Sequence, residues 1–589
     1  MDLARLGPEE RRNALDRMEQ EEFDVVVIGG GVTGTGAALD AATRGLSVAL
    51  VEQRDWASGT SSRSSKLIHG GLRYLEQLDF ELVLEAKREQ SLMLGRLCPH
   101  LARPVAFLFP LTHFVWERAY VGAGILLYDI MTRHRDLPRH THMSRRRALR
   151  EFPSLAPDRI KGAIQYYDAL VDDARHTLTL ARTASLHGAA LASSARVVDL
   201  VETGSRVTGV RVRCLESGRE IVIRAQQVIN ATGVWTDEIQ HMVGRGRIHV
   251  RASKGIHLVV PRDRIHGESG LILRTEKSVL FVIPWKSHWI IGTTDTDWEL
   301  DLAHPAASQT DIDYLLGQVN AVLAQPLTRD DIEGVYAGLR PLLRGESDAT
   351  SELSRKHAVT QSVSGLITVA GGKYTTYRIM ARDAINLAAR GLSQRVPRCC
   401  TDRTPLVGAP GYQAFWNRRE TLAEESGLHV TRIEHLLGRY GSRIEELLAL
   451  IEDRPGLGEP LEGAPTYLAV EALYAASHEG ALHLDDVLTR RTRISIETFD
   501  RGVAAARHVA ALIGEVLGWD EATIAREIEH YEARVSAELL SQEQPDDGTA
   551  DAARLGAPDV RLGGRGGRGG LASADPAEVV RLSDRRGED

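Results

Sequence analysis

The sequence is short of cysteine, of long hydrophobic runs and of positive charge. Its 589 residues include four cysteines, none at metal-ligand spacing, which predicts a reduced, cytosolic protein without a disulfide framework. No run of about 18 apolar residues occurs, which excludes an ordinary transmembrane helix, and the N-terminus lacks the apolar core of a signal peptide. The formal net charge of -8 argues against general nucleic-acid binding, so any anion site has to be local.

The first motif in the sequence is a βαβ unit over residues 23–52. An apolar strand, a glycine turn, an alanine-rich helix and a second apolar strand follow one another there. The turn carries Gly29, Gly31 and Gly34 in a G-x-G-x-x-G pattern, and Glu52 ends the second strand, where its carboxylate can accept from a ribose hydroxyl. The helix N-terminus adds free N–H donors for a pyrophosphate. The unit predicts a dinucleotide site, and its near-terminal position favours FAD over NAD.

Two later glycine segments could complete this site. The segment VINATGVW places Gly233 at the end of an expected strand, and VAGGKYTTYR places Gly371 and Gly372 before an expected helix. Each segment alone is equally typical of an ordinary strand-to-helix turn. Together with the first fingerprint they indicate one discontinuous nucleotide site.

Residues 58–75, SGTSSRSSKLIHGGLRYL, concentrate hydroxyl groups and positive charge without any acid. Ser/Gly-rich runs are usually solvated linkers. The alternative is a surface built to hold an anion, and the position just beyond Glu52 favours it.

Basic residues recur at the ends of expected strands and helices in distant parts of the chain. Any single one is typically a solvated charge or half of an ion pair. As a group they support the hypothesis of a pocket for a small phosphorylated substrate, because Arg and Lys both bind phosphate oxygens. The residues are Arg73, Lys254 with His257, Arg340, Arg355 and Lys373.

The remaining sequence predicts a sheet, a helical region and a tail. Residues 250–345 contain alternating apolar runs typical of an antiparallel sheet, interrupted by one helix that Ser308 is expected to cap. After Pro405 the pattern is helical to about residue 540. The end of the chain, with GGRGGRGG at 563–570, has the composition of a disordered tail. Its two RGG repeats leave RNA binding as an alternative of a different class.

These motifs resemble those of the FAD-dependent glycerol-3-phosphate dehydrogenases, which are aerobic respiratory enzymes of the glycine-oxidase and D-amino-acid-oxidase-like flavoprotein class. The resemblance runs from about Asp24 to Arg382 and more loosely to about residue 540. Its most selective part is TSSRSSKLIHGGLRYLE. The other matching segments are VIGGGVTGTG, YYDALVDDARHTL, NATGVW, KGIHLVVP, FVIPW, IIGTTDTDW, GLRPLL and GGKYTTYR.

The resemblance implies an α/β fold with a Rossmann-like FAD-binding domain, an antiparallel β substrate domain and an α-helical C-terminal domain. With the patterns above, we expect the chain to divide into an N-terminal extension at 1–22, a discontinuous FAD-binding domain at 23–95, 165–250 and 345–400, a substrate domain at 96–164 and 251–344, a helical domain at 401–545 and a disordered tail at 546–589.

The resemblance also implies oxidation of sn-glycerol 3-phosphate to dihydroxyacetone phosphate, with electrons passing to FAD and then to membrane quinone. His257 is the expected base for the C2 hydroxyl proton, and Arg340 would stabilise the developing alkoxide. This chain has Ile256 where the family has serine in Lys-Gly-Ser-His, which puts a polar contact from that position in doubt. The residues expected to line the substrate site are Arg73, Tyr74, Arg340, Arg355 and Lys373.

Within the stretch at 58–75, the resemblance assigns one part to FAD and one part to the substrate. Hydroxyls and backbone N–H groups of its first half should bind FAD, and a glycine pair should let the chain pass close to the flavin. Added to the glycines and Glu52 named above, these cofactor residues are Thr60, Ser61, Ser62, Ser65, Gly70 and Gly71.

Electron transfer to quinone requires access to the bilayer. The segment FVWERAYVGAGILLYDIMTRHR at 114–135 could rest at a membrane surface, or it could be a core helix with basic ends. We expect a cytoplasmic protein that is peripheral on the inner face of the plasma membrane if this segment docks. A glycerol-3-phosphate oxidase that reduces O2 is the alternative activity. The sequence leaves a homodimer open, and no nucleic-acid partner is expected.

Overall fold

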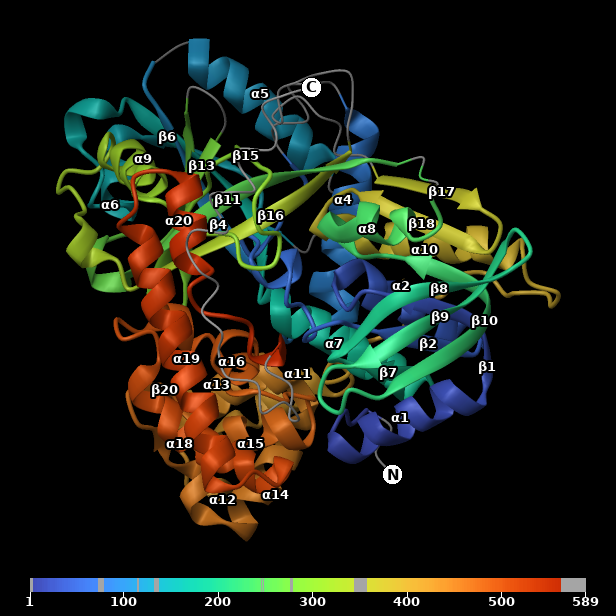
Figure 1. Ribbon diagram of the computed structural model, residues 1–589. Coiled ribbons are helices and arrows are strands. Elements are labelled where there is room, and N and C mark those ends of the chain that lie inside the picture. The colour runs from blue at the N-terminus through green and yellow to red at the C-terminus, as the bar shows by residue number, and fades with distance from the viewer. Residues whose placement is uncertain are drawn as a thin grey trace, which may run out of the picture.

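The computed structural model describes residues 4–71, 79–113, 116–131, 137–244, 246, 248–275, 279–343 and 357–562. Two sheets lie beside each other, and the helices of the C-terminal third form a separate group at the lower left of Figure 1. The class is α/β, as predicted.

The first sheet grows from the predicted βαβ unit. Among the described residues it has eight strands, with β17-β18-β10-β1-β2-β7 as its main order and β9 and β8 continuing from β10. Strands β1 (Glu22–Ile28), β2 (Val48–Val51), β10 (Glu220–Asn230) and β18 (Leu366–Gly371) pair in parallel. Their carboxyl ends therefore meet at one edge, where ligands bind in open α/β sheets. The other strands are β7 (Ala190–Ala192), β8 (Ala195–Thr203), β9 (Arg206–Cys214) and β17 (His357–Val363).

Helices cover both faces of this sheet. On one face α2 (Val32–Thr43), α7 (Asp173–Leu186) and α10 (Tyr377–Ala389) pack together, and their alanine and leucine side chains share a core with β1 and β2. On the other face lies α1 (Pro8–Gln20), within the expected N-terminal extension, and it buries Leu15 and Met18 against the sheet.

The second sheet is mainly antiparallel. In the described parts of the chain it has ten strands, and only the β4–β12 pairing is parallel. The predicted helix is present as α9 (Gln309–Asn320), where Ser308 forms a capping box with Asp311. Its apolar side chains Ile312, Leu315, Leu316 and Val319 are buried. The strands are β3 (Leu67–Ile68), β4 (Ala102–Leu111), β5 (Thr141–Ser144), β6 (Gly162–Val171), β11 (Val250–Pro261), β12 (Gly270–Arg274), β13 (Val279–Trp285), β14 (His288–Gly292), β15 (Thr296–Trp298) and β16 (Gly334–Leu343).

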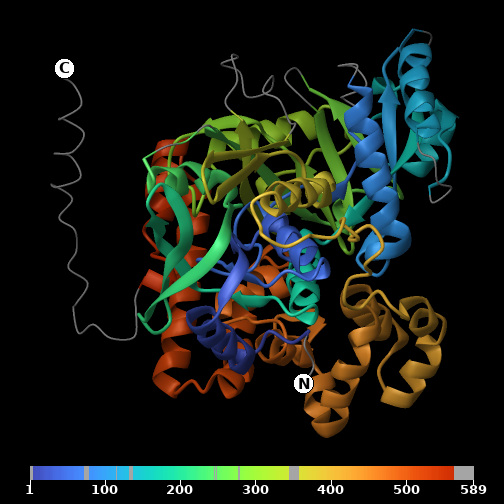
Figure 2. The same ribbon diagram turned by 90° about the vertical axis from the view of Figure 1, so that its right-hand side faces the viewer.

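Two helices pack on one face of the second sheet, at the upper right of Figure 2. They are α4 (Phe80–Leu92) and α5 (Trp116–Ile130), and their buried side chains pack on β4 and β6. Shorter helices are α6 (Arg145–Glu151) beside β5 and α8 (Thr236–His241) after β10. Strand β6 runs across the expected domain limit at residue 165, and β3 joins this sheet from the expected FAD-binding part.

The C-terminal helices bury a core of their own, rich in leucine and alanine. They are α11 (Tyr412–Asn417), α12 (Arg419–Ser426), α13 (Val430–Tyr440), α14 (Ile444–Asp453), α15 (Ala469–Ser477), α16 (Leu484–Asp486), α17 (Ile494–Glu497), α18 (Val503–Leu517) and α19 (Glu521–Gln542), with a hairpin of β19 (Pro460–Leu461) and β20 (Ala464–Leu468).

The expected disordered tail is wrong at its start. Helix α20 (Asp547–Arg554) packs on α19, buries Ala550 against Trp298 and Leu339, and pairs Asp547 with the buried ammonium of Lys254. Composition alone suggested disorder because this helix has few apolar residues, whereas its order rests on contacts with distant segments. The RGG repeats at 563–570 lie outside the described residues.

Candidate functional site

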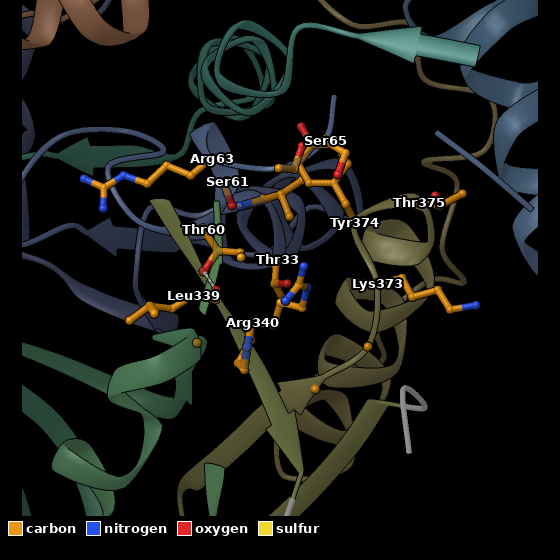
Figure 3. A pocket seen from close by; sticks show the side chains of 18 of the residues that line it. Thr33, Thr60, Ser61, Arg63, Ser65, Leu339, Arg340, Lys373, Tyr374 and Thr375 are labelled. Carbon is orange, nitrogen blue, oxygen red and sulfur yellow. Dashed lines mark hydrogen bonds between the residues drawn. The ribbon is translucent and has the colours of Figure 1, made fainter. Parts of the chain in front are cut away.

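A cavity of about 890 Å³ lies at the carboxyl edge of the first sheet and extends under the second. Both sheets and α5 contribute to its wall. Of the predicted site residues, it is lined by Gly29, Gly31, Glu52, Thr60, Ser61, Ser65, Gly71, Gly233, His257, Arg340, Gly371, Gly372 and Lys373. Figure 3 shows several of these side chains around the pocket.

The predicted dinucleotide turn is tight enough to require its glycines. Gly29 has a φ of +111°, and a Cβ there would lie 2.7 Å from the carbonyl oxygen of Ala231. A Cβ on Gly34 would lie 1.9 Å from the carbonyl oxygen of Gly29. Gly31 is the N-cap of α2, and Ser61 Oγ accepts from Val32 N at 2.9 Å. The helix N-terminus thus faces the cavity with the geometry that holds a pyrophosphate.

Glu52 sits at the end of β2 with most of its side chain buried. Its carboxylate accepts from Gly30 N at 2.6 Å and from Arg54 N at 2.8 Å. Burial raises the pKa of Glu52, and these two N–H groups offset part of that rise. Oε1 also accepts from Ser58 Oγ at 3.5 Å, whereas Oε2 keeps a second lone pair beside its bond from Gly30 N. Glu52 is therefore oriented to accept a further hydrogen bond from a ligand hydroxyl.

Replacing Gly34 with alanine should abolish cofactor retention, because the new methyl group cannot fit against Gly29 without separating α2 from the turn. The purified variant is expected to be colourless, with its flavin content near zero by absorbance. Gly317→Ala is the matched control, since a Cβ at that exposed helical position meets nothing within 4 Å and should leave flavin content unchanged. A fully yellow Gly34→Ala protein would contradict this account of the turn.

Arg340 is held rigidly at the second sheet's side of the cavity. Its guanidinium donates to Thr293 Oγ1 at 3.1 Å and to the carbonyl of Thr294 at 3.0 Å, and it pairs with Asp295 at 3.3 Å. It passes directly over Gly255, where a Cβ would lie 2.4 Å from Nη2. A guanidinium fixed in this way presents its positive charge to an anionic group in the cavity.

His257 lies on β11 with only 2% of its surface exposed. Its Nε2 forms a 2.8 Å hydrogen bond with Ser65 Oγ, and its ring stacks on Tyr336 with centroids 4.7 Å apart. Burial lowers the pKa of His257 well below its usual value, and the positive charges of Arg340 and Lys66 lower it further. The imidazole is therefore neutral at neutral pH and can accept a proton.

The expectation that Lys254 belongs to the anion pocket is wrong. Its ammonium is fully buried, pairs with Asp311 at 2.6 Å and with Asp547, and lies over the Trp298 ring. Side chains alternate across a strand, so Lys254 points away from the face that carries His257. Ile256 shares the face of Lys254 and is buried in the core under α9, which removes it from the cavity.

Several predicted residues take other positions. Ser62 lines a smaller second cavity, and its carbonyl accepts from Lys66 and Arg493. Gly70 lies behind the wall, where its N–H donates to Tyr128 OH at 2.8 Å. Lys373 does line the large cavity, but in Figure 3 its side chain extends away from Arg340. Arg73, Tyr74 and Arg355 lie outside the described residues.

Sequence reasoning missed the charged network that fastens residues 55–66. Lys66 is fully buried and pairs with Asp173 at 2.9 Å, so it anchors the chain and does not face the cavity. Arg493 pairs with the same Asp173, and Arg491 forms a two-pronged pair with Asp55 at 2.6 and 2.7 Å. The charged partners of Lys66 and Asp55 lie in the segments YYDALVDDARHTL and TRRTR. No local feature of either segment shows that it contacts residues 55–66.

Two family models match the chain. Residues 24–378 match the model described as FAD dependent oxidoreductase, and residues 399–524 match the C-terminal domain of alpha-glycerophosphate oxidase. The first match covers the nucleotide turn and the Arg340 region, and the second covers the C-terminal helices from α11 to α18.

Named relatives are similar along most of the chain. Glycerol-3-phosphate dehydrogenase 2 of Mycobacterium tuberculosis is 59% identical over 559 residues, which are 95% of this chain and 96% of the relative. The mitochondrial glycerol-3-phosphate dehydrogenase of Homo sapiens is 37% identical, with 87% of this chain and 73% of the relative covered. A solved structure of the glycerol-3-phosphate dehydrogenase from Bacillus halodurans, complexed with FAD, superposes with a TM-score of 0.75 at 28% identity and covers 90% of this chain and 98% of its own.

Proposed function

Because the chain belongs to the family of FAD-dependent glycerol-3-phosphate dehydrogenases, we propose that it oxidises sn-glycerol 3-phosphate to dihydroxyacetone phosphate and passes the electrons to a membrane quinone. FAD is its cofactor. The observation that carries the proposal is one cavity whose wall joins the nucleotide turn to Arg340 and His257. The glycine cradle, the α2 N-terminus and the oriented Glu52 carboxylate fit the FAD that the family binds.

The chain's own residues have to hold a phosphate ester and remove one proton. Glycerol phosphate is largely dianionic at neutral pH because its second pKa is about 6. We propose that Lys373 binds its phosphate and that Arg340 stabilises negative charge developing on the C2 oxygen. When bound, FAD supplies the acceptor for the C2 hydride. Arg73, Tyr74 and Arg355, which lie outside the described residues, are proposed to complete the phosphate contacts.

His257 is the proposed base for the C2 hydroxyl proton. Its ring is neutral, and Ser65, which also lines the cavity, lies within hydrogen-bonding distance of Nε2. A proton can therefore pass from the substrate through the Ser65 hydroxyl to the imidazole, while the C2–H bond breaks with its electron pair leaving as hydride.

His257→Gln should lower kcat/KM by about 10²–10⁴-fold with FAD retained. Because the pKa of His257 is lowered, its basic form persists as pH falls from 7 through 6.5 and is lost only at more acidic pH. The wild-type protein should show this acid limb in its pH–rate profile, and the variant should keep only the substrate's own limb near pH 6. An unchanged rate and profile would remove His257 from the role of base.

Exposed apolar side chains at the mouth of the cavity support quinone as the acceptor. Helix α5 buries Val121 and Ile125 but leaves Leu126 and Ile130 49% and 67% exposed. Tyr120 and Leu127 of the same helix are exposed and also line the cavity, as does the exposed Phe80 of α4. In the part of the chain described here, no helix is both long and apolar enough to cross a bilayer. A peripheral contact through α4 and α5 would bring the cavity to the acyl region.

The double substitution Leu126→Glu with Ile130→Glu should separate membrane access from chemistry. Reduction of quinone in anionic vesicles is expected to fall at least about tenfold, because burying each aliphatic side chain contributes about 1.5–3 kcal/mol. Reduction of a water-soluble dye should be unchanged. The matched control is Leu539→Glu with Leu540→Glu, two exposed leucines of α19. Equal loss in both assays, or no loss with vesicles, would contradict the membrane proposal.

A peroxide measurement with the same substrate distinguishes the oxidase alternative from the quinone-linked dehydrogenase. A glycerol-3-phosphate oxidase would form one hydrogen peroxide per substrate oxidised in air, whereas a quinone-linked dehydrogenase should form little peroxide while quinone is present. Stoichiometric peroxide would replace the quinone proposal. RNA binding by the RGG repeats concerns residues outside those described, and no contact in the structure favours it.

A further inference from the structure

A second cavity, of about 130 Å³, lies where all three parts of the chain meet. Its wall combines the loop that follows β2, the start of β16, and α19 with the segment after α20. It borders the large cavity at Arg63 and Ser58, which line both. A space of this size has room for several waters or for a small tetrahedral ion.

The wall of this second cavity carries more positive than negative groups. The seven arginines that line it are Arg54, Arg63, Arg490, Arg493, Arg534, Arg554 and Arg561. The four acids that line it are Asp485, Glu527, Glu538 and Asp559.

Each of these four acids already has a cationic partner. Asp485 and Glu538 pair with Arg534, Asp559 pairs with Arg54, and Glu527 pairs with His483. The two bonds to Glu216 and Glu527 raise the pKa of His483 to about 9, so that histidine is charged. Buried acids behind the wall neutralise three more of the arginines: Asp55 and Asp486 pair with Arg490, Asp172 and Asp173 with Arg493, and Asp486 also with Arg561.

Two of the arginines are under-neutralised. Among the described residues Arg63 has no ion pair, and its side chain donates only to the carbonyl of Ala303 at 3.4 Å. In Figure 3 it extends away from Ser61 and Ser65, and so from the nucleotide turn. Burial lowers the pKa of Arg63 to about 9, and the charges of Arg54, Arg490 and Arg554 add to the effect.

Arg554 is the second under-neutralised group. Its side chain is 4% exposed, its nearest carboxylate is Glu538 at 3.7 Å, and its Nη1 has no hydrogen-bond partner among the described residues. Its Nη2 lies 3.3 Å from His304 Nδ1. A buried guanidinium with an unused donor is costly unless a ligand supplies the missing acceptor.

We propose that this second cavity is a binding site for a small phosphate-class oxyanion, held between Arg63 and Arg554. Guanidinium groups converging from different segments suit the several oxygens of a tetrahedral anion. Since Arg63 belongs to the loop beside the nucleotide turn and Arg554 to the segment after α19, the bound ion ties that loop to the C-terminal helices. The site borders the large cavity at Arg63, but it does not depend on the proposed reaction.

The test uses the FAD-loaded protein, with inorganic phosphate as the probe and chloride at equal ionic strength as the reference. Phosphate should raise the Tm by about 1–3 °C in the wild-type protein. Arg554→Met should abolish that rise, yet in chloride it should unfold at the same or a higher temperature, because it removes a buried charge with an incomplete partner. Arg63→Met should behave in the same way. Arg454→Met, an exposed arginine paired with Glu515, should keep the full rise.

A second arm distinguishes this site from phosphate bound in the substrate cavity. Equilibrium dialysis of Lys373→Met protein, which lacks the described residue proposed to bind the substrate's phosphate, should still find about one labelled phosphate per chain, and none after adding Arg554→Met. The proposal is overturned if the wild-type Tm does not respond to phosphate. It is equally overturned if the rise survives both Arg554→Met and Arg63→Met, or if Lys373→Met alone removes all binding.

Discussion

Arg340→Ala is expected to reduce kcat/KM for sn-glycerol 3-phosphate by about 10²–10³-fold while the protein stays yellow. The guanidinium lines the cavity, yet its fixed contacts are with Thr293, Thr294 and Asp295, between β14 and β15 of the second sheet, whereas the nucleotide turn belongs to the first sheet. Its removal should therefore cost charge stabilisation of the reacting oxygen and leave FAD binding intact. Steady-state kinetics together with the flavin-to-protein ratio measures both quantities.

Two controls show whether the loss of rate is specific to the Arg340 guanidinium. Arg329→Ala removes an exposed arginine of the same sheet region, paired with Asp313, and should leave kcat/KM within about twofold of the wild-type value. Adding guanidinium ion to the Arg340→Ala protein should restore part of the rate, because the cavity left by the side chain matches that ion. Near-normal turnover by Arg340→Ala would take Arg340 out of the site.

Arg491→Met should destabilise the folded protein by about 3–5 kcal/mol and loosen FAD binding as well. The substitution leaves Asp55 buried beside Arg490 with half of its compensation gone. Asp55 lies between Glu52 and the hydroxyl-rich stretch, so its displacement reaches the nucleotide turn directly. The midpoint of denaturant unfolding, followed together with flavin release, is the measurement.

The matched control for this second prediction is Arg454→Met. Arg454 also makes a two-pronged pair, with Glu515 of α18, but both side chains are about half exposed. Water solvates either partner when the other is removed, so little change in the unfolding midpoint is expected. If both variants shift the midpoint equally, the buried arginines are not what fastens the C-terminal helices to the FAD loop.

Local rules made part of this molecule predictable. The turn at Gly29 and Gly34 follows from backbone geometry within a few residues, and the Ser308 cap depends only on the next turn of helix. The meeting of the three glycine segments follows from the parallel pairing of β1, β10 and β18, whose carboxyl ends share one edge. Short stretches of sequence are enough to predict such features.

The two-residue alternation of side chains along a strand would have corrected the prediction for Lys254. Lys254 and His257 are separated by an odd number of positions on β11, so they have to point to opposite faces of the sheet. Grouping them in one pocket contradicted that rule, and the structure places only His257 at the cavity. Applying the two-residue period to KGIH would also have placed Ile256 in the core.

Contacts between segments that are distant in the sequence could not be predicted from it. Asp55 and Arg491 are 436 residues apart, and nothing near either residue reveals the other. The order of α20 depends in the same way on Lys254 and Trp298, which come from the second sheet. A single sequence specifies such partners only through the complete fold, which is why the role of the C-terminal helices did not emerge from the motifs.

We propose that one cavity holds FAD and oxidises sn-glycerol 3-phosphate. Rapid mixing of the FAD-loaded protein with sn-glycerol 3-phosphate under anaerobic conditions tests it most directly, because no electron acceptor other than the bound flavin is present. We predict that the absorption band of the oxidised flavin bleaches, and that the Arg340→Ala protein bleaches at least about a hundredfold more slowly. An FAD-replete protein that keeps its oxidised band after mixing would contradict the claim.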